Sequence, residues 1–281
     1  MERIQQALER ARAEREAGGL PNSSALASSP EALGRPLRQT RPPVADVKVA
    51  YTGTATIPVD PVRLRERRIF VTEEPDHVAD AYKVLRTHIL QRMRANRWKT
   101  LAVTSPGEGN GKTLTAINLA ISLAREVNQT ILLVDLDLRR PSLGGYFVDG
   151  PTRGLSDFLT EGVEVADLLI HPGIDRLVIL PGNHSFTQSS EMLSSPRMVQ
   201  LVQEFRTRYP DRLTLFDMPP LLAGDDVLAF LPYVDAVVLV IEEGKTTKAE
   251  LAQAYELLGE KNIIGTVLNK SEDASSGIGY Y

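Results

Sequence analysis

The stretch Ser105-Pro106-Gly107-Glu108-Gly109-Asn110-Gly111-Lys112-Thr113 decides the fold of this chain. It follows an apolar run at 100–104 and precedes a helix-type run at 112–127. A glycine-rich turn between a strand and a helix, closing in Gly-Lys-Thr, is typical of a phosphate-binding loop. Glycine lets successive backbone N–H groups point at phosphate oxygens, and the helix dipole turns its positive end toward the same point.

The loop predicts a nucleotide site. Lys112 would reach the β- and γ-phosphates, and the Thr113 hydroxyl would ligate Mg²⁺. Pro106 stands where the common pattern has glycine, so the alternative is a structural turn that happens to end in Gly-Lys-Thr. The order of strand, turn, Lys-Thr and helix favours the nucleotide site. In the loop and the first helical turn, the residues expected to contact the nucleotide are Gly107, Gly109, Asn110, Gly111, Lys112, Thr113 and Leu114.

From residue 100 onward, apolar strand-like runs alternate with amphipathic helix-like runs. Strands are expected at 100–104, 130–137, 177–180, 213–217, 236–241 and 263–269. Helices are expected at 112–127, 156–169 (in two short pieces), 190–208, 225–231 and 247–259. This alternation indicates an α/β fold of the P-loop NTPase type, with a mostly parallel twisted sheet covered by helices on both faces.

Three aspartates stand at the ends of predicted strands. Asp135 and Asp137 close the run ILLVDLD, and Asp217 closes LTLFD. In parallel sheets, ligands bind at the carboxyl ends of strands, so these carboxylates should lie at one edge with the loop. There they could hold the hydration shell of Mg²⁺ and accept a proton from an attacking hydroxyl. The alternative is that they are ordinary turn and helix-capping aspartates.

Two further features lie near the C-terminus. Asn269 ends the last predicted strand, where its amide could contact an adenine edge or simply form a turn. Tyr280 and Tyr281 end a Gly/Ser-rich segment. A flexible leash of this kind could carry a phenol into an active site, and a plain solvated tail is the alternative.

The N-terminal part of the chain has a different character. Residues 1–19 predict an amphipathic helix, and residues 20–64, rich in Pro, Ser, Ala and Thr, predict a flexible linker. Residues 69–71 are expected to form a short edge segment. Residues 77–97 predict a helix with an apolar stripe. The stretch 80–99 is locally basic, so it could face anionic lipid, an acidic partner or only water.

Composition excludes several classes of protein. The 281 residues carry a net charge of −4, which does not suggest a nucleic-acid binder. Cysteine is absent, which excludes disulfides and thiolate metal sites and suits the cytosol. With no apolar run of about 18 residues, no membrane span is expected. No signal peptide is expected either, because the N-terminus lacks an apolar segment.

Taken together, the motifs SPGEGNGKT, VDLDLRRP and FDMPP and the terminal tyrosine pair resemble the bacterial tyrosine kinases (BY-kinases). The runs DAYKVLRTHILQRMR, TAINLAISLAREVNQT and LSSPRM are similar to those of exosortase-associated exopolysaccharide autokinases. The resemblance covers residues 65–281, which divide into a P-loop kinase domain at 65–270 and a tyrosine-bearing tail at 271–281. The wider relatives are the MinD/ParA-type ATPases.

The resemblance implies an autokinase that moves the γ-phosphate of MgATP to Tyr280 and Tyr281 and regulates exopolysaccharide or capsule polymerisation and export. In the family's pattern, the catalytic positions correspond to Lys112, Asp135, Asp137 and Asp217, and the metal ligands to Thr113, Asp135 and Asp217. The loop residues named above and Asn269 remain the expected nucleotide contacts. The resemblance further implies a cytoplasmic protein held at the inner face of the membrane by a transmembrane chain-length-determinant (Wzz-like) activator.

Two departures from the family pattern matter. The oligomerising helix of the family corresponds here to Asp80, Lys83 and Arg86, a charge-preserving variant that keeps a homo-oligomeric ring as an expectation. Gly107 stands where partition ATPases carry an additional lysine, which disfavours that group. The alternative function is a nucleotide-switched MinD/ParA-like ATPase that binds a membrane partner without phosphorylating tyrosine.

Overall fold

The computed structural model describes residues 54–71 and 76–271. All of them belong to the compact unit that spans residues 43–281. The predicted N-terminal helix, the first part of the predicted linker, and the acceptor candidates Tyr280 and Tyr281 lie outside the described residues.

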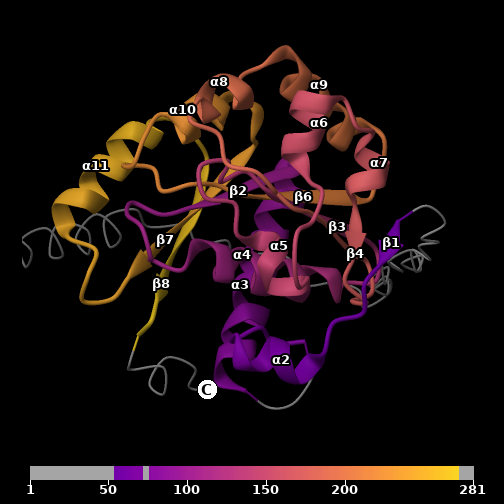
Figure 1. The fold of residues 1–281 in the computed structure, drawn as a ribbon. Coiled ribbons are helices and arrows are strands. Elements are labelled where there is room, and N and C mark those ends of the chain that lie inside the picture. The colour runs from indigo at the N-terminus through magenta and orange to yellow at the C-terminus, as the bar shows by residue number, and fades with distance from the viewer. Residues whose placement is uncertain (1–53, 72–75, 272–281) are drawn as a thin grey trace, which may run out of the picture. The chain divides into compact units, whose positions relative to one another are not determined.

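The described residues form an eight-stranded sheet in the order β1-β4-β5-β3-β6-β2-β7-β8 (Figure 1). Its strands are β1 (Ala55–Thr56), β2 (Thr100–Thr104), β3 (Thr130–Asp135), β4 (Ile170–His171), β5 (Leu177–Leu180), β6 (Arg212–Asp217), β7 (Ala236–Glu242) and β8 (Ile263–Asn269). Neighbouring strands pair in parallel except β4 and β5, which are antiparallel. The predicted mostly parallel α/β fold is therefore confirmed.

Helices cover both faces of this sheet (Figure 1). One face packs against α2 (Pro61–Glu66), α3 (His77–Asn96), α4 (Lys112–Ala124) and α5 (Leu143–Phe147). The other packs against α6 (Leu155–Glu161), α7 (Val165–Leu168), α8 (Ser189–Leu193), α9 (Pro196–Thr207), α10 (Asp226–Phe230) and α11 (Lys248–Leu258). A 3₁₀ turn at Leu231–Tyr233 follows α10.

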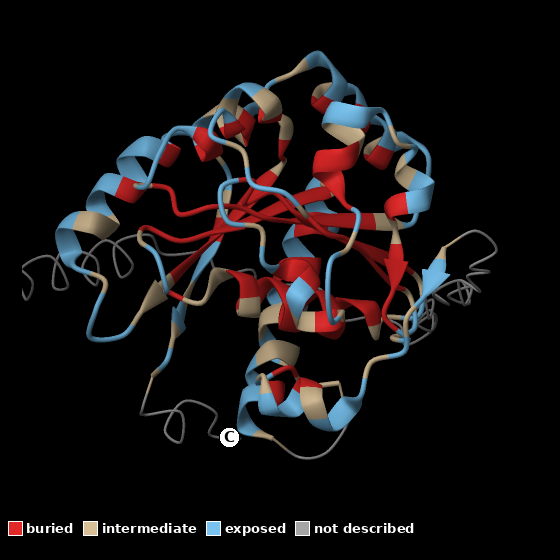
Figure 2. Ribbon diagram, viewed as in Figure 1, coloured by how far each residue is buried: buried red, intermediate tan, exposed pale blue. Residues whose placement is uncertain are grey.

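The strands alternate their side chains between two apolar cores. Leu101 and Val103 of β2 face the core under α3 and α4, whereas Ala102 faces the opposite one. Because both faces are covered, every residue of β2 and β3 is buried, and Figure 2 shows these strands in red. This explains why their sequences read as continuous apolar runs rather than as alternating ones.

Several predicted boundaries need correction. The strand expected at 130–137 ends at Asp135, and the helix expected at 112–127 ends at Ala124. The helix expected at 190–208 is two helices, because Pro196 begins α9 and the Ser195 hydroxyl caps it by accepting a bond from Met198 N. Residues 69–71 form no strand.

The predicted linker also ends earlier than residue 64. Within it, β1 pairs with β4, and α2 begins after Asp60, whose carboxylate accepts the Val62 N–H. Sequence reasoning missed β1, α2, β4 and α5 because each is only two to six residues long. Elements this short have too few positions to show a period.

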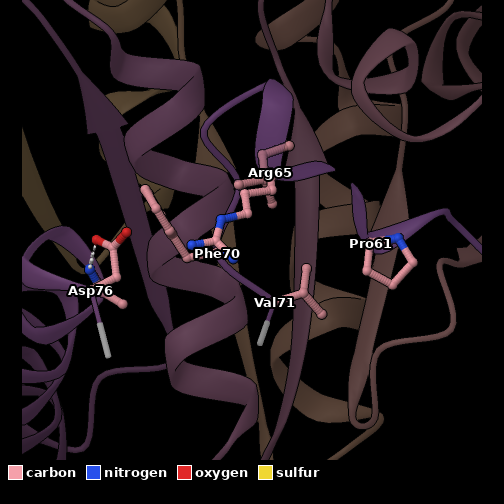
Figure 3. Close-up of a pocket in the computed structure, with 7 residues that line it drawn as sticks. Pro61, Arg65, Phe70, Val71 and Asp76 are labelled. Carbon is pink, nitrogen blue, oxygen red and sulfur yellow. Dashed lines mark hydrogen bonds between the residues drawn. The ribbon is translucent and has the colours of Figure 1, made fainter. Parts of the chain in front are cut away.

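The segment after α2 is fixed to α4 by one buried amide. Asn118 Nδ2 donates to Arg68 O at 2.9 Å, and its Oδ1 accepts from Phe70 N at 2.9 Å. Figure 3 shows that side chains from α2, this segment and the start of α3 line a small cavity. Its volume of about 10 Å³ suits one water molecule, so it is no site for a nucleotide.

Candidate active site

The carboxyl ends of β2, β3 and β6 meet at one edge of the sheet (Figure 1). In the strand register, Asp135 lies opposite Asp217, and Asp217 lies opposite Val103. The glycine-rich loop leaves β2 directly after these pairs and leads into α4. The structure therefore brings together the loop, Asp135 and Asp217 at the edge where the sequence placed them.

Two glycines give the loop its shape. Gly109 has φ +76° and Gly111 has φ +89°, in the left-handed region that favours glycine. A Cβ on Gly111 would lie 2.0 Å from Nδ2 of Asn269. That nitrogen donates to Asn110 O at 2.9 Å. The Asn269 amide thus braces the loop, and its expected contact with adenine stays a prediction.

We expect Gly111→Ala to weaken ATP binding at least about tenfold and to lower the free energy of unfolding by about 1–3 kcal/mol, because the new methyl group meets the Asn269 amide in a strained backbone conformation. Titration with a fluorescent ATP analogue and thermal unfolding measure the two effects. Gly145→Ala is the matched control, since nothing lies within 4 Å of a Cβ there. Equal behaviour of the two variants would contradict the role of the Gly111–Asn269 contact.

Asn110 shapes the loop from inside. Its side chain is almost fully buried, its Oδ1 accepts from Gly107 N at 3.0 Å, and its Nδ2 donates to Thr246 Oγ1 at 3.2 Å. An asparagine suits this position because one side of the amide accepts while the other donates. The Asn110 side chain was predicted to contact the nucleotide. Its hydrogen bonds instead support the loop that would hold the nucleotide.

Two lysines that hold the loop through its carbonyl oxygens were not predicted from the sequence. Lys270 Nζ donates to Gly109 O at 2.9 Å and to Glu242 Oε1 at 2.9 Å. Lys245 Nζ donates to Glu108 O at 3.1 Å. These residues follow β7 and β8, more than a hundred positions from the loop, so no local pattern could reveal them.

Lys112 lies among carboxylates. Its Nζ donates to Asp137 Oδ2 at 2.8 Å and lies 3.9 Å from Asp217 Oδ1. Burial opposes the charged ammonium, but the negative charges of Asp217 and Asp137 outweigh it and raise the pKa of Lys112. The lysine is therefore held charged at the point where β- and γ-phosphates are expected.

Asp135 holds the chain that follows β3. Its carboxylate accepts backbone N–H groups of Asp137 at 3.1 Å and of Ser142 and Leu143 at 2.9 Å each. Burial, followed by the charge of Asp217, raises the pKa of Asp135 to about 7. Three backbone bonds leave little of this carboxylate for a metal. The arrangement supports a positioning role more strongly than the predicted ligation of Mg²⁺.

Asp217 is the most unusual polar group of this edge. It is fully buried, and neither carboxylate oxygen has a hydrogen-bond partner among the described residues. Burial raises the pKa of Asp217 to about 6, although Lys112 and the nearby Thr113 hydroxyl lower it. A buried carboxylate costs free energy unless something compensates it. A buried carboxylate that has no hydrogen-bond partner in the described part of the chain and lies near a threonine hydroxyl fits Mg²⁺.

Within the described ranges, no cluster of three or more His, Asp or Glu side chains could hold a metal ion alone. Mg²⁺ characteristically needs few protein ligands, because phosphate oxygens and water complete its shell. Thr113 and Asp217 are the residues that would hold it. Leu114, also predicted to contact the nucleotide, packs its side chain on the core under α4.

A hollow of about 330 Å³ opens beside Lys112. Its walls comprise Glu108, Gly109, Lys112, Asp137, Arg139, Arg140, Pro219, Pro220, Ala223 and Asp226. Asp137 lines it, whereas Asp135 and Asp217 do not. The hollow leaves room next to Lys112 for a second reactant, with Asp137 within its wall.

One wall of the hollow is fixed by an ion pair that the sequence did not predict. Arg139 Nε donates to Asp226 Oδ2 at 2.6 Å, and Asp226 also accepts a bond from the Ser189 hydroxyl. Asp226 is buried, so it orients the guanidinium firmly. The only signal in the sequence was the pair Arg139-Arg140, which follows Asp137 after one leucine and had been given no role.

No helix among residues 54–71 and 76–271 is both long and apolar enough to cross a membrane.

This chain is similar to known nucleotide-binding proteins and tyrosine kinases. The model of the CobQ/CobB/MinD/ParA nucleotide binding domain matches residues 101–278. Tyrosine-protein kinase YwqD of Bacillus subtilis (strain 168) is 31% identical over 78% of this chain and 92% of its own length. The succinoglycan biosynthesis transport protein ExoP of Rhizobium meliloti (strain 1021) is 28% identical over 74% of this chain, which spans only 27% of that longer protein.

Solved structures agree. The VpsO kinase domain is 30% identical, with a TM-score of 0.62 over 69% of this chain and 95% of that domain. The kinase domain of Escherichia coli tyrosine kinase ETK is 26% identical, with a TM-score of 0.65 over 83% of this chain and 94% of that domain.

Proposed function

Because this chain belongs to the bacterial tyrosine-protein kinases, within the CobQ/CobB/MinD/ParA nucleotide-binding family, we propose that it transfers the γ-phosphate of MgATP to its own tyrosines Tyr280 and Tyr281. The observation that carries the proposal is the hollow beside Lys112. It adjoins the phosphate loop and is lined by Asp137, a carboxylate able to accept a phenol proton.

Each group has a defined task in this reaction. The backbone of Gly107 to Gly111 would cradle the phosphates, and Lys112 would offset the charge that spreads onto the γ-phosphoryl oxygens. When bound at Thr113 and Asp217, Mg²⁺ supplies further positive charge to the same oxygens.

Asp137 is the general base in this proposal. An unperturbed tyrosine has a pKa of about 10, so the phenol needs a base at neutral pH. Asp137 Oδ2 lies beside Lys112 Nζ at 2.8 Å, and its side chain is 9% exposed toward the hollow. Once Lys112 turns to the phosphates, this oxygen is released to take the proton, while Asp135 holds the intervening backbone in place.

The biological setting extends the proposal. ExoP is a transport protein of succinoglycan biosynthesis, which supports a role in exopolysaccharide assembly. We further propose a place at the inner face of the membrane through a transmembrane activator. We also propose a homo-oligomeric ring through α3. Asp80 and Lys83 pair with each other within this helix at 2.7 Å, so a ring contact through them would have to exchange this pair. Arg86 instead donates to Ser122 O at 3.1 Å, so a ring contact through it would have to compete with α4.

Phosphopeptide mapping tests the acceptor assignment. After incubation of the full chain with MgATP, we expect phosphate on Tyr280 and Tyr281, and the Tyr280→Phe/Tyr281→Phe variant should fall to background incorporation. Tyr255→Phe is the matched control, because Tyr255 is an exposed tyrosine on α11 and should not be an acceptor. ATP binding without phosphotyrosine, even with the membrane partner's cytosolic segment added, would favour the nucleotide-switched alternative.

A further inference from the structure

A second hollow lies at the opposite end of the sheet from the phosphate loop. It has a volume of about 400 Å³ and lies where α3 ends and β2 begins. Because β2 runs from Thr100 to Thr104, the strand separates this hollow from the loop that follows Thr104. The hollow therefore has no place in the phosphotransfer chemistry.

The rim of this hollow is basic. Arg94, Arg97 and Lys99 line it, against the single acidic residue Asp211. Arg94 is only loosely engaged, at 3.4 Å from Asn128 Oδ1 and 3.7 Å from a Glu126 oxygen. The basic stretch noted in the sequence thus gathers its C-terminal members around a concave site.

The floor of the hollow is apolar. Met93 and Leu213 are buried, and Trp98 is partly buried beside them. A hollow with an apolar floor and a basic rim offers a place for an apolar side chain flanked by carboxylates. An anionic bilayer surface, by contrast, is flat. It could contact the basic rim but would not reach the apolar floor.

Arg97 occupies a strained backbone position. It ends α3 with φ +57° and ψ +31°, the left-handed conformation in which glycine is usual. Strained non-glycine residues cluster at functional sites, where the side chain has a task that offsets the strain. Among the described residues, the Arg97 side chain makes no hydrogen bond or ion pair, so contacts within this part of the protein do not explain an arginine at this position.

We propose that this hollow is a docking site for an acidic peptide segment of a partner protein, with one apolar side chain resting on Trp98 and carboxylates meeting Arg94 and Arg97. Docking here would hold a partner on the kinase without obstructing the nucleotide site. The proposal is independent of the identity of the phosphate acceptor.

The chain contains a single tryptophan, so its fluorescence reports on this hollow directly. The probe is a blocked peptide of Asp and Glu around one central leucine, titrated into the full nucleotide-free chain. We expect saturable change in Trp98 emission, weakened by added salt because ion pairs at an exposed rim are screened.

Arg97→Gly is the decisive variant. Glycine removes the charge but suits the left-handed backbone, so thermal unfolding should not worsen while peptide affinity falls about tenfold. Arg92→Ala is the matched control, since Arg92 is exposed on the same helix but lies outside the hollow. Its affinity for the peptide should match that of the natural chain.

Three results would overturn the proposal. The first is no change in Trp98 emission at millimolar peptide. The second is equal affinity of the natural chain and the Arg97→Gly variant. The third is a response to phosphatidylglycerol vesicles but not to the peptide, which would make the basic rim a membrane contact. None of these outcomes depends on kinase activity, so each is separable from failure of the proposed phosphotransfer.

Discussion

Replacing Lys112 with methionine is expected to reduce tyrosine phosphorylation at least about 1,000-fold. The same change should lower the free energy of unfolding of the nucleotide-free protein by about 3–5 kcal/mol at pH 8, because it leaves Asp137 and Asp217 buried without their cation. Radiolabelled phosphate incorporation and denaturant unfolding measure the two quantities.

The loss of stability in Lys112→Met should depend on pH. Lys112 lowers the pKa of both Asp135 and Asp217, so its removal raises both further. At about pH 5 these carboxyls are protonated and no longer repel one another, and the loss of stability should be smaller than at pH 8.

The double variant Lys112→Met/Asp137→Asn provides the control. Removing one uncompensated charge should restore part of the stability at pH 8 without restoring activity. A Lys112→Met protein as stable as the natural one at pH 8 would show that the lysine does not offset these carboxylates.

Asp217→Asn is expected to have the opposite effect on stability. Phosphotransfer should fall at least about 100-fold, because the amide binds Mg²⁺ poorly. The nucleotide-free protein, however, should become more stable by about 1–3 kcal/mol at pH 8, since each unit of pKa corresponds to about 1.4 kcal/mol. Lys112 keeps its partner Asp137 at 2.8 Å.

The direction of the stability change in Asp217→Asn follows from proton binding by Asp217. The folded-state pKa of Asp217 is about 6, above its ordinary value of 3.8, so the folded protein binds this proton more tightly than the unfolded chain. Ionisation of Asp217 therefore lowers stability as pH rises from about 4 to about 6, and the loss is complete above that range. The gain from Asp217→Asn should vanish near pH 4.

Unfolding curves of Asp217→Asn at pH 4 and pH 8 test this prediction. Asp175→Asn serves as a control at an exposed carboxylate. If Asp217→Asn destabilises the protein at pH 8, Asp217 is not the strained group that the structure indicates. Opposite stability changes in Lys112→Met and Asp217→Asn, with activity lost in both, would show that Lys112 offsets the buried carboxylates and that Asp217 is kept for its function at a cost in stability.

The long, strongly patterned elements were predictable from sequence. β2 and β3 are buried throughout because helices cover both faces of the sheet. Asp135 and Asp217, which end β3 and β6, then had to meet at one edge. The glycine loop was predictable because its backbone geometry requires particular residues at fixed spacings.

The features of the site that were not predicted depend on contacts between residues far apart in the sequence. Arg139 pairs with Asp226 and Lys270 with Gly109, and no local period links such residues. The task of Asp135 was also hidden, since a carboxylate that accepts backbone N–H groups and one that binds metal occupy the same place in a sequence. Only the folded geometry distinguishes them.

The place of β1 and α2 in the sheet and its core has a practical consequence for anyone who shortens this protein. A chain cut at residue 65, where the family resemblance begins, would lose β1, the strand partner of β4, and would divide α2. It would also remove Leu64, which is 1% exposed in the core beneath the sheet. Truncation for crystallography or assay should therefore begin before residue 54.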